Sequence, residues 1–151
     1  MLFIADQLKR SYKGEAWHGP CVEESLAGVT WQQAFDRPIA GAHSIAELVV
    51  HLAVWVEQPL LALNGKPWPN DIPVDLDWPE AHRASAANWE ASLTRLRAAE
   101  ESIIALVRNL TPEQLEVKVT GKPFTTYFML NGVVQHNIYH AGQIMLLRKL
   151  L

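Results

Sequence analysis

Four segments of the chain repeat apolar residues at intervals of three and four, and this period restricts the fold more than any other feature. The spacing places apolar side chains along one face of an α-helix. No strand-like alternation persists, and no repeat period is visible. Helices with one apolar face are stable only when they pack on one another. The sequence therefore predicts an all-α fold, a four-helix bundle that occupies residues 1–151 as a single domain.

Local signals predict where these helices begin and end. The second helix begins after a capping box, Ser44-Ile-Ala-Glu47, and ends at Asn64-Gly65. The first helix should cover Leu2 to Tyr12. The third should run from about Pro79 to Asn109, and the fourth from about Thr126 to Leu150. Capping signals at Thr30 and Thr111 predict two further short helical turns.

A proline-rich stretch, KPWPNDIPVDLDWP, joins the second and third helices. Its four prolines exclude a continuous helix or a central strand. A connection of this length is uncommon in a compact domain and is often functional. We expect an ordered link that allows a crossover between helices two and three, instead of a simple hairpin.

Composition restricts the setting and the partners. The chain has 151 residues, 49% of them hydrophobic, and a formal charge of −3 with both signs scattered. No basic stripe favours nucleic acid or anionic lipid. A lone cysteine, Cys21, cannot form an internal disulfide and fits a reducing cytoplasm. Without a recognisable leader or an apolar run of bilayer length, we expect a cytoplasmic protein that binds neither membranes nor nucleic acid.

Three histidines in apolar helical segments form the candidate site. His136 and His140 are four residues apart, so they share a helix face, roughly 5–6 Å apart at Cβ. His51 lies midway along the second helix. Each alone is also compatible with an ordinary polar or core histidine. Together, three imidazoles on two helices favour one divalent ion with coordination positions left open.

The other three histidines are not assigned as ligands. His18 precedes a Gly-Pro pair in a predicted loop and could line the mouth of the site. His43 precedes the Ser44 cap, and His82 opens the third helix, where exposure is expected.

Three stretches of the chain resemble the DinB-like superfamily, which includes the YfiT-like metalloenzymes. They are HNIYHAGQI, SIAELVVHLAVW, and WHGPCVEESLAGVTWQQAFDRPIAGAHS. The resemblance spans nearly the whole chain and implies a metal triad of His51, His136 and His140. It also implies a nickel or zinc ion, a homodimer, and chemistry that uses a low-molecular-weight thiol. One departure is Cys21, where similar sequences tend to carry serine.

The residue after His136 restricts the reaction. It is Asn137, so the His-Glu-x-x-His arrangement of zinc proteases, with its glutamate base, is absent. A metal-bound thiol needs neither a protein nucleophile nor a dedicated base. The leading hypothesis is therefore thiol transfer to a small electrophile, with no protein residue assigned as catalytic. Hydrolysis by metal-bound water and a non-catalytic metal-binding dimeric bundle remain as alternatives.

Several further residues are candidates for contact with the ligands or the pocket. Gln143 lies seven residues after His136 and could orient a ligand, although surface exposure is equally expected. Tyr139 fits a packing role better than a pocket role. Glu100 interrupts the third helix's apolar seam, and we expect it to turn outward while Ala99 fills the slot. Cys21 stands at a predicted helix start, which lowers a thiol pKa, but a small buried cysteine is the commoner case. Trp17, like Trp68 and Trp78, lies in a connection and could equally line a pocket or anchor its loop to the core, whereas Trp55 and Trp89 fit the core.

Overall fold

The fold is all-α, as predicted. A computed structural model describes residues 3–69, 71–78 and 84–151, and within these ranges it has eight helices and no strand. Lys118 and Thr125 form an isolated antiparallel β-bridge. The helices are α1 Phe3–Tyr12, α2 Val22–Leu26, α3 Trp31–Phe35, α4 Ile45–Leu63, α5 Val74–Asp77, α6 Ala86–Val107, α7 Pro112–Glu116 and α8 Thr126–Arg148.

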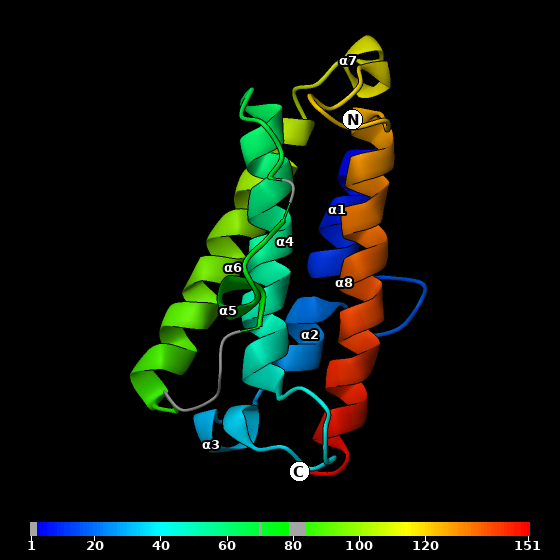
Figure 1. The fold of residues 1–151 in the computed structure, drawn as a ribbon. Helices are drawn as coiled ribbons and strands as arrows, with labels where there is room; N and C mark the ends of the chain where they lie inside the picture. The colour runs from blue at the N-terminus through cyan, green and yellow to red at the C-terminus, as the bar shows by residue number, and fades with distance from the viewer. Residues whose placement is uncertain (1–2, 70, 79–83) are drawn as a thin grey trace.

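The four longest helices contact one another in pairs. α4 packs on α6 and α8, and α1 packs on α8 and α6. In Figure 1, α4 and α6 run in the same direction, whereas α1 and α8 run in the opposite direction. The link from α4 passes back alongside that helix and carries α5, which contacts α4. The proline-rich connection predicted from the sequence therefore lies alongside α4.

Capping residues fix most helix starts where the sequence predicted them. The Ser44 side chain accepts from the Glu47 N–H, and the Glu47 carboxylate accepts from the Ser44 N–H. The boxes at Thr30 and Thr111 are formed in the same way. The third long helix is different, because α6 begins at Ala86 behind a Ser85 cap. The predicted start at Pro79, and His82 with it, lie outside the described residues.

Glu100 corrects one prediction. Its side chain is 0% exposed and faces α8, although the sequence pattern placed it outward. There the Asn137 amide donates to the Glu100 carboxyl at 2.7 Å and to the Ser11 hydroxyl at 3.2 Å. The hydrogen bond from Asn137 on α8 offsets part of the cost of burying Glu100. The residue pattern of α6 alone cannot reveal a partner on another helix. Ala99, expected in the same slot, is buried beside it, and Trp89 is in the core as predicted.

The membrane expectation also needs a correction. By length and composition, α4 is long and apolar enough to cross a bilayer, so one apolar run does reach that length. Its flanks are occupied by protein, however, because α3, α5, α6 and α8 all pack on it. Most of its residues are buried in the interior, as expected of a central core helix.

Candidate metal centre

The structure brings the three predicted histidines together. His51 comes from the middle of α4, and His136 and His140 come from successive turns of α8, which packs on α4. The His136 Nε2 atom lies 3.0 Å from the His51 Nε2 and 2.9 Å from the His140 Nε2. One ligand atom from each ring falls within 4.8 Å of the others. The three rings therefore converge on a single point.

Two outer partners orient the rings. The His51 Nδ1 lies 2.6 Å from an oxygen of Asp77 at the end of α5, and that oxygen also accepts from the Trp55 indole at 2.8 Å. The His140 Nδ1 lies 2.6 Å from the Gln143 side-chain oxygen. Since both acceptors require an N–H, both rings carry their proton on Nδ1. Their Nε2 lone pairs are left pointing inward.

The inward lone pairs fit a cation. Burial, with added repulsion from the neighbouring imidazoles, lowers the pKa of His136 to about 3. Burial lowers the pKa of His140 to about 4 and also lowers that of His51. The rings are therefore neutral near pH 7, and the single N–H that His136 can carry on Nε2 cannot satisfy two facing lone pairs well. Metal–nitrogen bonds of about 2.0–2.1 Å would put neighbouring nitrogens roughly 3 Å apart, close to the separations seen.

Aromatic stacking holds the link against the triad. Trp78, directly after α5, stacks on His51 with ring centroids 3.8 Å apart and on His43 at 3.7 Å. His43, which the sequence did not assign as a ligand, stands outside the three-histidine group. The stack fixes the end of α5 and so places the Asp77 carboxylate.

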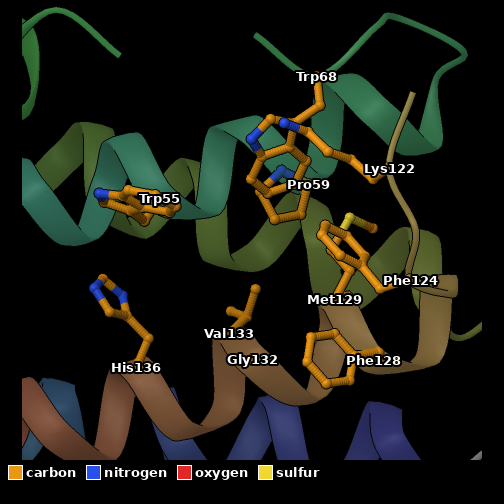
Figure 2. A pocket seen from close by; sticks show the side chains of 10 residues that line it. All are labelled: Trp55, Pro59, Trp68, Lys122, Phe124, Phe128, Met129, Gly132, Val133 and His136. Carbon is orange, nitrogen blue, oxygen red and sulfur yellow. The ribbon is translucent and has the colours of Figure 1, made fainter. Parts of the chain in front are cut away.

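Two cavities meet at His136. The first, here called the triad cavity, has a volume of about 510 Å³ and is bordered by all three triad histidines, His43 and Trp78. The second, here called the aromatic cavity, has a volume of about 320 Å³ and lies between α4 and α8 beneath Trp68 (Figure 2). Among the described residues, no carboxylate lines either cavity.

The other candidate residues differ in whether they contact the triad histidines. Gln143 holds His140, as proposed from its spacing. Tyr139 is exposed, but it borders the triad cavity with its ring 4.9 Å from that of His140. Glu100 accepts a hydrogen bond from the Asn137 amide and belongs to that cluster instead of the triad.

Three N-terminal candidates lie away from the site. Trp17 and His18 are exposed and line a separate hollow with Val134 and Ile138, so His18 is not at the mouth of the triad cavity. Cys21 is fully buried before α2, and burial raises its thiol pKa, contrary to the lowering expected from a helix start. The alternative of a small buried cysteine is the correct one.

Sequence reasoning missed Asp77. It lies in a four-residue helix inside the proline-rich link, where no periodic pattern exists to assign a face. The available signal was the position of an acidic residue next to Trp78 in a long connection. That signal indicates a functional loop without identifying its partner.

A comparison with known protein families identifies a matching family. The family model described as the DinB superfamily matches residues 22–144. No curated protein and no solved structure matches the chain. The matched range contains all three histidines as well as Asp77 and Gln143.

Proposed function

Because this chain belongs to the DinB superfamily, we propose that it is a divalent-metal-dependent enzyme whose ion is held by His51, His136 and His140. The observation that carries the proposal is the convergence of three Nε2 atoms, two of them fixed as lone-pair donors by Asp77 and Gln143. The scaffold is a four-helix bundle of α1, α4, α6 and α8. Nickel and zinc are the ions we expect, since both accept imidazole ligands.

Thiol transfer to a small electrophile is the reaction we favour. When bound, a divalent ion stabilises a thiolate and orients its sulfur. The chain's own contribution is to hold three neutral imidazoles and to leave one side of them open to the triad cavity, which Trp78 and Leu48 border with apolar surface. A low-molecular-weight thiol would be the co-substrate.

Hydrolysis is the second candidate, and the positions of the described carboxylates argue against it. A hydrolase of the metalloprotease kind needs a carboxylate base near the metal-bound water. The nearest candidate, Asp77, already accepts from His51 and Trp55, and no carboxylate lines the triad cavity among the described residues. A non-catalytic metal-binding bundle is the third candidate. We expect a cytoplasmic homodimer with a small-molecule substrate.

Metal content and activity test the proposal together. Protein purified without an affinity tag should contain about one divalent ion per chain by elemental analysis. The His136→Ala/His140→Ala double variant should contain none, whereas His18→Ala, an exposed histidine away from the site, should bind like the native chain. Metal-loaded protein should then turn over thiol-plus-electrophile pairs and leave simple esters and amides unchanged.

The other outcomes select among the alternatives. Ester or amide cleavage without thiol transfer would favour the hydrolase. Metal binding without either activity would favour the non-catalytic bundle. Equal metal content in the native chain and the double variant would overturn the metal site itself.

A further inference from the structure

The aromatic cavity extends along α8 away from the triad. Its α8 lining recurs every four residues, at Phe128, Gly132 and His136, with Met129 and Val133 beside them at the same spacing. Eight residues of helix separate the ends of this row, which corresponds to roughly 12 Å. Figure 2 shows His136 at one end, and Lys122 with Phe124 at the other. The cavity is thus an elongated slot that reaches the triad at one end only.

Four of its lining residues are tryptophan or phenylalanine. The Trp55 and Trp68 ring centroids are 6.4 Å apart, and Phe124 meets Trp68 edge-on at 6.2 Å. Phe128 continues the row, 5.5 Å from Phe124. A volume of about 320 Å³ with apolar walls suits a small molecule that buries an apolar body.

Lys122 gives the slot a charge at its far end. It is the one charged side chain among the described residues that line the cavity, and it is half-buried. No described carboxylate forms an ion pair with it. A cation beside apolar walls, without a counterion from the described residues, favours an anionic group on the ligand. A single ammonium matches one carboxylate.

Gly132 keeps the middle of the slot open. It lies inside α8, where alanine would give a more stable helix, and it borders the cavity. A Cβ built there meets no atom within 4 Å. Any larger side chain would therefore extend into the space that a ligand would use.

From these observations we propose that the aromatic cavity binds an elongated apolar monocarboxylate. The carboxylate pairs with Lys122, the apolar body lies against the rings and over Gly132, and the other end approaches His136. Binding in itself does not depend on the metal. The further step, that this molecule is the electrophilic substrate, rests on the proposed function.

Three small molecules that differ only in their polar group test the charge preference. They are phenylbutyrate, phenylbutanol and phenylbutylamine, titrated by calorimetry and by tryptophan fluorescence into metal-free protein prepared with a chelator. Removing the ion prevents the carboxylate from binding to it. We expect phenylbutyrate to bind about fivefold more tightly than the alcohol, and the amine not to bind. Lys122→Met should abolish the preference, while Lys118→Met, an exposed lysine nearby, should retain it.

A second pair of variants tests the place of binding. Gly132→Leu should weaken phenylbutyrate and phenylbutanol alike by at least about tenfold, because it fills the slot. Gly142→Leu changes the other glycine inside α8, which is exposed and lines neither cavity, and should bind like the native chain. Circular dichroism checks that both variants keep their helices, and Lys122→Met supplies the test if Gly132→Leu does not fold.

Equal affinity for the acid and the alcohol would overturn the proposal. So would an unchanged preference in Lys122→Met, or native affinity in a folded Gly132→Leu. Metal content, measured separately, decides the proposed function. The two proposals can therefore fail independently. A chain that holds no ion can still bind the acid in this cavity, and a chain that binds metal can fail to bind the acid.

Discussion

At the scale of single residues, Asp77 joins the proline-rich link to the triad. One of its oxygens accepts from both His51 and Trp55. Groups that orient a ligating imidazole typically contribute about 10- to 100-fold in metal affinity. Asp77→Ala should therefore weaken metal binding by about that factor, measured by competition with a chromogenic chelator. Asp75→Ala, which removes an exposed acid from the same short helix, is the control. An equal loss in both variants would show that the negative charge of α5, and not the contact between Asp77 and His51, supports metal binding.

Glu100 predicts a pH dependence of stability. Burial raises its pKa to about 8, above an ordinary value of 4.5, while the Asn137 amide opposes the shift. Between these values the folded chain keeps a proton that the unfolded chain has lost. The free energy of unfolding contributed by this group is therefore complete below about pH 4.5 and falls as pH rises towards about 8.

Glu100→Gln should remove that dependence. A glutamine resembles the neutral acid, and its amide can donate to the Asn137 oxygen, which has no hydrogen-bond partner among the described residues. We expect native-like stability at acid pH and a gain on the order of 3–5 kcal/mol at alkaline pH. Urea unfolding across the range, with exposed Glu101→Gln as the control, measures it. A constant difference between variant and native chain at every pH would contradict this account.

Residue-scale prediction succeeded where spacing alone fixes a face. His136 and His140 share a face because they are four residues apart, and His51 lies among apolar neighbours. It failed for Glu100 because the Asn137 amide that satisfies it comes from another helix. It failed for Asp77 because prolines and the stacking of Trp78, and not a periodic pattern of apolar residues, determine the conformation of the chain there.

At the scale of elements, the start of α4 determines where His51 points. The Ser44 hydroxyl accepts from the Glu47 N–H at 3.3 Å, and the Glu47 carboxylate accepts from the Ser44 N–H at 2.7 Å. Ser44→Ala removes the first bond at a buried cap and should cost about 1–2 kcal/mol in the free energy of unfolding. Ser102→Ala, inside α6 and exposed, should change it by less than about 0.5 kcal/mol. Urea unfolding of the two variants compares them, and equal effects would mean that the cap has no special role.

Helix ends were predictable because caps are local. The box at Ser44 and the stop at Asn64-Gly65 need only a few neighbouring residues. The position of α5 was not predictable, since a four-residue helix has no apolar period. It is held instead by Trp78, whose ring partners, His43 and His51, are more than 25 residues away in the sequence.

At the scale of the whole molecule, the triad joins parts of the chain that are far apart in sequence. His51 lies 85 residues before His136, and the two meet because α4 packs on α8 (Figure 1). The sequence predicted the helices and the histidines, but only packing could establish that their nitrogens meet at one point. The unfolded chain has no such point, so an ion that binds here binds the folded state preferentially.

Metal should therefore stabilise the whole fold by mass action. At a free concentration one hundred times the dissociation constant, the gain is about 2.7 kcal/mol. Thermal unfolding with nickel or zinc, compared with chelator, should show a higher midpoint for the native chain. His136→Ala/His140→Ala should lose the shift while staying folded, because its helices keep their caps and the buried residues around Leu130 and Ile144. His18→Ala should keep the shift. An equal metal-dependent shift in the double variant would place the ion elsewhere, and the three rings would then be a polar cluster that α4 and α8 share without a metal.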